Sequence, residues 1–194
     1  MSSIHSQVVV AYDFSHSGRA ALYRAIALAT RAPFHILHFV CVIDPHRGLA
    51  AMPPVHAVDY DYAESVQRAL TDEVAQELRE SHVADRVHFF VHARIGKPAE
   101  EILEVAREVG ADLIIVGTKG LTGVERIVLG SVAERVVREA GCAVEVARPK
   151  TYNHVALMEI VDAKVQQHHP YVPPHRYTYE DHNALLRPLE WPLY

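Results

Sequence analysis

The chain has 194 residues, a formal net charge of −5 at pH 7 and a pI of about 6.3. This length is enough to bury one core and to carry an additional segment. The negative charge argues against a general nucleic-acid binder, which would present a basic face. No apolar run is long enough to cross a bilayer, and the first residues lack the charged-then-apolar pattern of a secretory signal. We therefore expect a cytoplasmic protein without nucleic-acid or membrane partners.

In chain order, the hydrophobic pattern alternates between short β-branched runs and longer amphipathic segments. The predicted strands occupy residues 7–12, 34–43, 86–93, 112–116 and 142–147. The predicted helices occupy residues 17–29, 60–80, 98–109 and 131–140. Residues 44–59 contain prolines and a glycine and are expected to form a loop. This alternation predicts parallel pairing in a doubly wound α/β sheet, with helices on both faces.

Small and polar residues mark several of the expected helix ends. The candidate N-terminal caps are Ser15 or Ser17 for the first helix and Ser131 for the fourth. Glycines at the opposite ends predict C-terminal caps, because a glycine adopts the left-handed conformation that ends many helices. These glycines are Gly110 for the third helix and Gly141 for the fourth.

Fourteen histidines raise the question of a metal site. His35 and His38 are an odd step apart on one predicted strand, so their side chains face opposite sides. His88 and His92 share a face but lie about 13 Å apart, too far to hold one ion. No metal site is expected.

A glycine pattern follows the fourth predicted strand. Two residues separate Gly117 from Gly120, and nine separate Gly120 from the pair Gly130 and Ser131. Glycines at a strand exit let backbone N–H groups approach a phosphate, and the start of a helix adds free donors and a positive dipole end. The spacing differs from the Walker loop and from the Gly-x-Gly-x-x-Gly of dinucleotide-binding folds. The alternative is that these glycines serve turns only.

The pattern reads Gly-x2-Gly-x9-Gly-Ser and is accompanied by three further segments, at residues 8–15 (VVVAYDFS), 96–103 (GKPAEEIL) and 111–117 (ADLIIVG). In this order and spacing they resemble the ATP-binding branch of the UspA-like universal stress protein family. The resemblance covers roughly residues 5 to 149. It implies a nucleotide-binding domain at residues 1–149 and leaves a C-terminal extension at residues 150–194.

The resemblance also implies the strand order 3-2-1-4-5, which the hydrophobic pattern alone does not give. In that order Cys41 and Cys142 lie on strands that are not neighbours. Their separation is too large for a disulfide, so both are expected to be buried free thiols.

The implied topology places the ligand site. In open parallel sheets the crevice lies beyond the carboxyl ends of the strands, where the strand order reverses. Asp13 and Gly117 stand at the two strand ends on either side of that reversal. The resemblance implies that the site binds ATP, or else AMP or ADP, with or without magnesium. The residues that it assigns to the nucleotide are Ala11, Tyr12, Asp13, Phe39 or Val40, Val116, Gly117, Lys119, Gly120, Gly130, Ser131 and Val132.

Several polar residues here have structural alternatives. Asp13 would also serve to begin the first helix, and Ser131 is expected to be an N-cap with or without a ligand. Lys119 stands where the family often has histidine or arginine, so its contact with phosphate is left open. Arg126 is interpreted as a solvated surface charge, and Asp112 as a residue that fixes the turn ahead of its strand.

No signature of catalysis is found in the sequence. The nucleophile elbow Gly-x-Ser-x-Gly and the metal motifs His-Glu-x-x-His and Cys-x-x-Cys are absent. Hydrolysis of ATP also needs an oriented water and charge stabilisation in the transition state, and no dedicated base is evident. The sequence therefore predicts binding, with hydrolysis slow at most and no catalytic residue assigned.

Residues 151–194 extend beyond the point where the resemblance ends. Residues 153–165 have apolar positions at near-helical spacing and predict a short amphipathic helix. The remainder mixes prolines and histidines with tyrosines and a tryptophan, a composition too aromatic for an ordinary flexible tail. We interpret it as an arm that docks on its own domain, a sister subunit or another protein. The alternative is a loosely ordered appendage.

The resemblance further implies a homodimer formed through the edge strand at residues 142–147. In this chain Glu145 replaces a usual apolar residue and Ala143 a usual proline, and an edge charge discourages pairing, so the usual geometry is in question. The leading interpretation is an ATP-binding regulatory protein of the universal stress type, acting through nucleotide-dependent conformation or partner binding. The alternative is an adaptor or accessory subunit whose arm binds other proteins, with the nucleotide structural or absent.

Overall fold

The computed structural model describes residues 5–31, 34–46, 48–49, 52, 58–85, 87–118 and 129–149. The chain divides into two units, Met1–Lys150 and Thr151–Tyr194, and all described residues belong to the first. Lys119, Gly120, Arg126 and the predicted C-terminal helix and arm therefore lie outside the described residues. None of the described helices combines the length and the apolar character that crossing a membrane requires.

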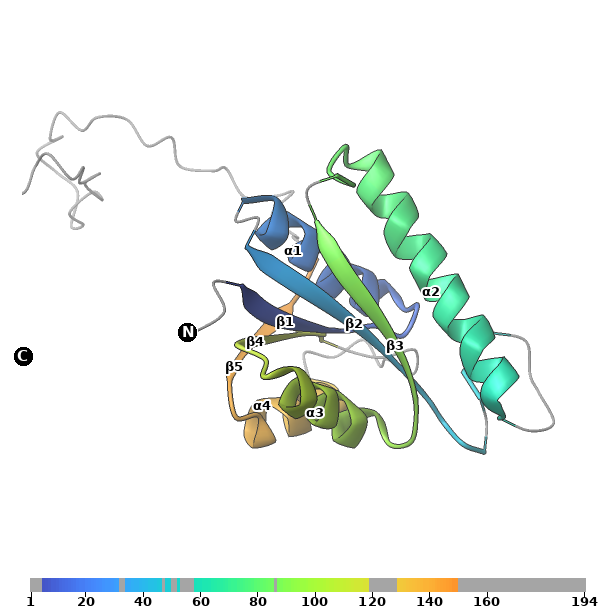
Figure 1. Cartoon of the computed structure of the whole chain (residues 1–194). Helices are drawn as coiled ribbons and strands as arrows, with labels where there is room; N and C mark the ends of the chain where they lie inside the picture. Colours follow the sequence, from blue (N-terminus) through green and yellow to red (C-terminus); the bar gives the residue numbers. More distant parts are fainter. Residues whose placement is uncertain are drawn as a thin grey trace, which may run out of the picture. The chain divides into compact units, whose positions relative to one another are not determined.

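Five parallel strands form one sheet in the order β3-β2-β1-β4-β5 (Figure 1). The strands are β1 (Ser6–Ala11), β2 (His35–Ile43), β3 (His88–Ile95), β4 (Leu113–Gly117) and β5 (Ala143–Ala147). Val10 of β1 pairs with Phe39 of β2 on one side and with Ile115 of β4 on the other. The predicted fold class and the implied strand order are confirmed.

Two helices cover each face of the sheet (Figure 1). One layer holds α1 (His16–Arg31) and α2 (Tyr60–Glu80), and the other holds α3 (Pro98–Val109) and α4 (Ser131–Glu139). Because side chains alternate along a strand, β1 contributes to both cores. Val8 and Val10 pack in the core with α1 and α2, Val9 packs in the core with α3 and α4, and all three are fully buried. Burial on both faces explains why such strands consist of continuous apolar runs.

Local signals set the ends of several helices. The Oγ atom of Ser15 accepts a hydrogen bond from the N–H of Gly18 at 3.0 Å and caps α1. The Oδ1 atom of Asp59 accepts one from the N–H of Tyr62 at 2.9 Å and caps α2. Gly110 ends α3 in the left-handed conformation, with φ of 64°. The predicted caps at Ser15 and Gly110 are confirmed.

Several predicted boundaries are wrong, among them the end of β3 and both caps of α4. β3 ends at Ile95 rather than at residue 93, because its limits follow its pairing with β2, where Ile43 lies opposite Ile95. The N-cap of α4 is Gly130, not Ser131, since a hydrogen bond from the N–H of Gly130 to Thr118 holds Gly130 extended. The C-cap of α4 is Ala140 rather than Gly141. Its extended backbone leads the chain directly toward β5, so no left-handed residue is needed.

Cys41 and Cys142 are both unpaired. Cys41 lies on β2 and Cys142 directly precedes β5, and the strands β1 and β4 lie between these two. Cys41 is buried, and this burial, with a smaller contribution from Asp13, raises the pKa of its thiol to about 12. Cys142 is partly exposed, contrary to the prediction that both thiols are buried.

The charge on the edge strand β5 has a partner within the domain. Both carboxylate oxygens of Glu145 contact the guanidinium of Arg24 on α1, with Nη2 to Oε2 at 3.1 Å. Glu145 is therefore not the unpartnered edge charge that we expected to discourage strand pairing.

Candidate functional site

A cavity of about 370 Å³ lies at the carboxyl ends of β1, β2 and β4, beside the starts of α1, α3 and α4. This is the point where the strand order reverses, as expected for a ligand site in this class of sheet. The lining residues are Ala11, Tyr12, Asp13, Gly18, Val40, Val42, Asp44, Pro98, Ile102, Val116, Gly117, Thr118, Gly130, Ser131, Val132 and Ala133.

Most of the predicted site residues meet at this cavity, namely Ala11, Tyr12, Asp13, Val40, Val116, Gly117, Gly130, Ser131 and Val132. Of the two alternatives on β2, Val40 lines the cavity and Phe39 is fully buried in the core with α1 and α2. Neighbouring residues of a strand face opposite sides, so only one of the two side chains can point into the site. Lys119 and Gly120 lie outside the described residues. Contact of any of these residues with a ligand stays a prediction.

Reasoning from the sequence missed part of the lining. Val42 and Asp44 follow Val40 at steps of two, so alternation along β2 points to them once Val40 is known to face the cavity. Pro98 and Ile102 lie one turn apart on α3, and nothing in the glycine motif points to them. The other missed residues, each next to or near a predicted one, are Gly18, Thr118 and Ala133.

The start of α1 forms one wall of the cavity and is held by side chains of its own turn. The Oδ1 atom of Asp13 accepts a hydrogen bond from the N–H of Ser15 at 3.0 Å. Between them Phe14 has a φ of 61°, a left-handed conformation that costs energy for a residue with a bulky side chain. Asp13 therefore has a structural role at the start of α1 while it also lines the cavity, so the two interpretations of this residue are compatible.

β4 and α1 meet in very close contact at Gly117. A Cβ atom at this position would lie 2.5 Å from the carbonyl oxygen of Ser17 and 2.6 Å from its carbonyl carbon. Backbone atoms cannot yield to such an overlap. The hydroxyl oxygens of Ser17 and Thr118 lie 3.4 Å apart beside it. Packing alone therefore requires a glycine at position 117, whether or not a ligand is bound.

The start of α4 forms another wall, and its N-cap residue, Gly130, has no side chain with which to cap it. The N–H of Gly130 donates to the carbonyl of Thr118 at 2.8 Å and is used within the protein. The N–H groups of Ser131, Val132 and Ala133 have no acceptor inside the helix, because the first turn of an α-helix precedes its own hydrogen-bond ladder. All three residues line the cavity. The site thus has backbone donors and the positive end of a helix dipole, which favour an anion.

Tyr12 connects the cavity with the α1 and α2 layer. Its N–H donates to the carbonyl of Val40 at 2.9 Å, and its hydroxyl donates to the carboxylate of Glu73. Glu73 also pairs with Arg19 of α1 at 3.1 Å. Burial first, and the hydrogen bond to Glu73 second, raise the pKa of the Tyr12 phenol far above its ordinary value. Tyr12 therefore stays protonated near neutral pH and acts by position, not as a base.

Two histidines meet across neighbouring strands, outside the cavity. Nδ1 of His38 on β2 lies 3.1 Å from Nε2 of His92 on β3, and Nε2 of His38 lies 2.8 Å from Oε1 of Gln7. Comparing histidines along single strands misses this pair. Burial first, and His92 second, lower the pKa of His38 to about 4. Within the part of the chain that the structure describes, no group of three or more His, Cys, Asp or Glu side chains could hold a metal ion.

The model of the universal stress protein family matches residues 5–148. The chain belongs to the universal stress protein family. A universal stress protein of Methanocaldococcus jannaschii is 33% identical over 149 residues, which cover 75% of this chain and 84% of that protein. The structure of the universal stress protein UspA from Lactobacillus plantarum is 26% identical with a TM-score of 0.55, over 74% of this chain and 98% of that one.

A third universal stress protein, from Arabidopsis thaliana, was solved with AMP bound. It is 15% identical with a TM-score of 0.50, over 76% of this chain and 94% of that one. At this identity its likeness to the present universal stress protein is one of fold.

Proposed function

We propose that this universal stress protein binds an adenine nucleotide, in the first place ATP, in the cavity at the carboxyl ends of β1 and β4. The observation that carries the proposal is the uncapped start of α4, whose first-turn residues line the cavity. A phosphate there would accept hydrogen bonds from donors that the helix itself leaves unused. The volume of about 370 Å³ suits a small molecule. The AMP in the Arabidopsis relative supports an adenine nucleotide as the ligand class.

In this proposal the phosphates lie against α4 and the nucleoside extends toward β1 and β2. The side chains of Val40, Ile102 and Val116 offer apolar contact for a base. The carboxylates of Asp13 and Asp44 are acceptors at the same cavity, suited to hydroxyl or amino groups. Magnesium would accompany ATP through the phosphate oxygens.

The proposed output is a nucleotide-dependent conformation or choice of partner, not turnover. A ligand that contacts Asp13 acts on the turn that begins α1, because Asp13 and Ser15 are joined by a hydrogen bond. The left-handed Phe14 stores strain in the same turn, and strained residues are points where two conformations readily differ. Binding is thereby linked to the position of α1.

The proposal includes a homodimer along the outer edge of β5 and action in the cytoplasm. The ion pair between Glu145 and Arg24 favours the dimer, because it removes an isolated charge from that edge. The unpaired Cys41 and Cys142 favour the cytoplasm, where thiols stay reduced.

Isothermal titration calorimetry of the full chain with ATP and magnesium chloride tests the nucleotide proposal. We expect saturable binding that Gly130→Val abolishes, since a branched side chain would then stand at the start of α4. Gly141→Ala is the matched control, because a Cβ atom at Gly141 meets no heavy atom within 4 Å. Thermal unfolding of each variant checks that it folds. Absence of binding for ATP, ADP and AMP alike, or undiminished binding by a folded Gly130→Val variant, contradicts the proposal.

A second candidate function is that of an adaptor or accessory subunit. It is favoured by the chain that follows the family match, which ends at residue 148 while the sequence runs to residue 194. Removal of residues 151–194 distinguishes the two functions. Loss of a co-purifying protein with ATP binding unchanged supports the adaptor, whereas an unchanged set of co-purifying proteins contradicts it.

A further inference from the structure

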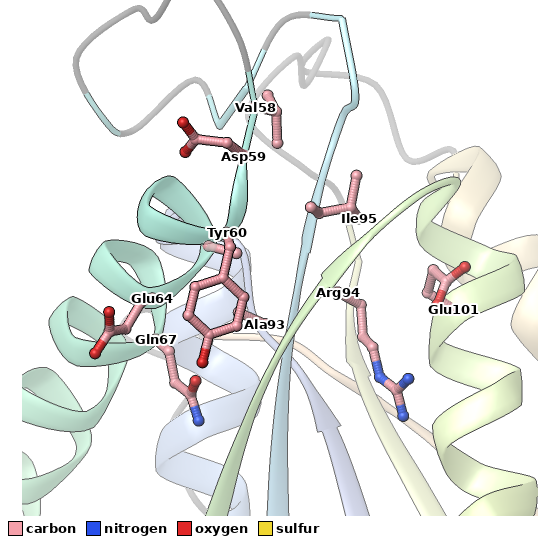
Figure 2. Close-up of a pocket in the computed structure, with 10 residues that line it drawn as sticks. Val58, Asp59, Tyr60, Glu64, Gln67, Ala93, Arg94, Ile95 and Glu101 are labelled. Carbon is pink, nitrogen blue, oxygen red and sulfur yellow. The ribbon is translucent and has the colours of Figure 1, made fainter.

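We infer that the outer edge of β3 binds a basic, extended segment of a partner protein as an added strand. The site is a groove of about 540 Å³ between the first turns of α2, the last residues of β3 and Glu101 of α3 (Figure 2). Hereafter it is called the β3 groove. It shares no lining residue with the cavity proposed for the nucleotide. The inference is therefore independent of the proposed nucleotide binding.

The backbone of β3 is available on one side. β3 stands at the end of the sheet, and its strand pairing is with β2. In a strand the N–H and C=O groups of successive residues point alternately to the two sides. The N–H of Gly96 donates to Ile43 of β2 at 3.0 Å, so the even-numbered residues face β2. Val91, Ala93 and Ile95 therefore direct their backbone groups outward.

A side chain of α2 confirms this direction and defines the usable part of the edge. Nε2 of Gln67 donates a hydrogen bond to the carbonyl oxygen of Val91 at 3.1 Å. Beyond Val91, the outward N–H and C=O groups of Ala93 and Ile95 border the β3 groove. Among the described residues no other strand lies on that side of β3. An added strand would satisfy these groups, which is the basis of peptide recognition by strand addition beside a helix.

Apolar side chains stand beside these backbone groups. Tyr60 is 80% exposed and Ile95 is 42% exposed, although both are large and apolar. Figure 2 shows Tyr60 on α2 reaching toward β3 and Ala93, with Ile95 at the end of the strand. A strand edge with exposed apolar side chains is a template for pairing unless it is covered, and this part of β3 has such side chains beside it. Tyr60 provides a surface for an apolar side chain of the added strand.

Charge identifies the kind of segment that fits. The ionisable residues that line the groove are Asp59, Glu64, Arg94 and Glu101. Arg94 pairs with Glu108 of α3, and Glu64 pairs with Arg68 of α2 at 2.9 Å. These pairs leave the carboxylate of Glu101 in excess, and Asp59, whose carboxylate caps α2, adds a second negative charge at the groove. A segment with Lys or Arg between apolar residues is complementary, whereas a second copy of this chain, with its net charge of −5, is less so.

Selection of random decapeptides displayed on phage against the full chain tests the inference. We expect the enriched peptides to alternate apolar residues with Lys or Arg, and to bind the purified chain in solution. Ala93→Pro removes an outward N–H without breaking the pairing with β2 and should weaken binding about tenfold. Tyr60→Ser should also weaken it, by about fivefold to tenfold, through lost apolar contact.

Charge reversal on α2 provides a matched pair of variants. Glu64→Lys places a cation in the β3 groove and should weaken binding of the basic peptides by severalfold. Asp72→Lys makes the same change at an exposed position of α2 outside the groove and should leave binding unchanged. If Ala93→Pro fails to fold, Tyr60→Ser decides the matter, because an exposed tyrosine contributes little to folding.

Three outcomes would overturn the inference. One is a failure to enrich any peptide, and another is an enriched set without basic residues or with equal affinity for the Tyr60→Ser variant. The third is self-association of the full chain that Ala93→Pro removes in analytical ultracentrifugation, which would assign the edge of β3 to a second copy. ATP binding, measured in the same samples, should be unchanged by every β3 variant.

Discussion

α1 and α4 both begin at the same cavity, but their first turns are satisfied in different ways. The start of α1 is closed by protein groups, with Ser15 accepting from Gly18 and Asp13 accepting from Ser15. The start of α4 has Gly130 as its cap and no side-chain hydrogen bond. One helix start is therefore closed by its own side chains, and the other has first-turn donors without an acceptor inside the helix. A helix start beside a cavity indicates a ligand only when the protein itself leaves it uncapped.

The largest effect that would sharpen this contrast is expected at Gly117, where β4 packs on α1. Gly117→Ala should lower the free energy of unfolding by about 3 kcal/mol, because the new methyl group overlaps the backbone of Ser17. Urea unfolding monitored by circular dichroism measures this change. Gly141→Ala, with open space around it, should stay within about 0.5 kcal/mol of the unaltered chain. Equal stability of the two variants would mean that the start of α1 is not tightly packed.

Acid should lower the stability of the domain without favouring either helix start. The responsible group, His38, lies on β2, away from both. The pKa of His38 falls from its ordinary 6.5 to about 4 in the folded chain, so the unfolded chain binds more protons between these values. Stability present above pH 6.5 should therefore decrease as the pH falls to 4, by about 2 to 3 kcal/mol. Urea unfolding at a series of pH values measures the loss.

His38→Gln should flatten this part of the pH profile, whatever its effect at neutral pH. The pKa of His92 is lowered first by burial and second by Arg94, and Glu108 raises it. Arg94 and Glu108 should retain their effects in the variant. A Ser15→Ala variant should keep the full acid sensitivity. An unchanged slope in His38→Gln would assign the acid response to other groups.

A smaller effect is expected from removal of the cap of α1. Ser15→Ala leaves the N–H of Gly18 without its acceptor and should cost about 1 kcal/mol of stability. Thermal and urea unfolding should agree on this loss. Ser15→Thr, which keeps a hydroxyl group, should recover most of it. A loss of ATP binding larger than the loss of stability would show that this helix start also contacts the ligand.

The smallest effect on stability is expected at Ser131. Ser131→Ala should change the free energy of unfolding by less than about 0.5 kcal/mol, because its hydroxyl caps nothing. Its affinity for ATP should fall by about threefold to tenfold, because Ser131 lines the cavity where the phosphates are proposed to lie and its hydroxyl can donate to a phosphate oxygen. Calorimetry and unfolding on the same sample separate the two quantities. A stability loss equal to that of Ser15→Ala would erase the contrast between the two helix starts.

The alternation of elements in the sequence predicts the α/β class, and the family resemblance adds the strand order and most of the cavity lining. Signals that act within one turn succeeded at Ser15 and Gly110 but failed at Ser131 and Gly141. Features set by a neighbouring element were missed. The end of β3 follows β2, the cap of α4 depends on a bond from Gly130 to Thr118, and His38 meets His92 only across two strands.

The site shows the same division between local and long-range information. The choice between Phe39 and Val40 depends on which face of β2 meets the cavity, and strand alternation gives two faces without saying which is which. The lining by Ile102 requires α3 to pack against β1 and β2, which the glycine motif does not predict. Contacts by Lys119 and Gly120 stay predictions, since these residues lie outside the described part of the chain.

The hydrogen bond from Gln67 to Val91 also affects how fast a bound segment dissociates from the β3 groove. Because Gln67 occupies the carbonyl of Val91, the part of the β3 edge that can pair with an added strand begins at Ala93. Few backbone hydrogen bonds can form over so short a part of the strand. A bound segment should therefore dissociate quickly, and different segments should exchange readily.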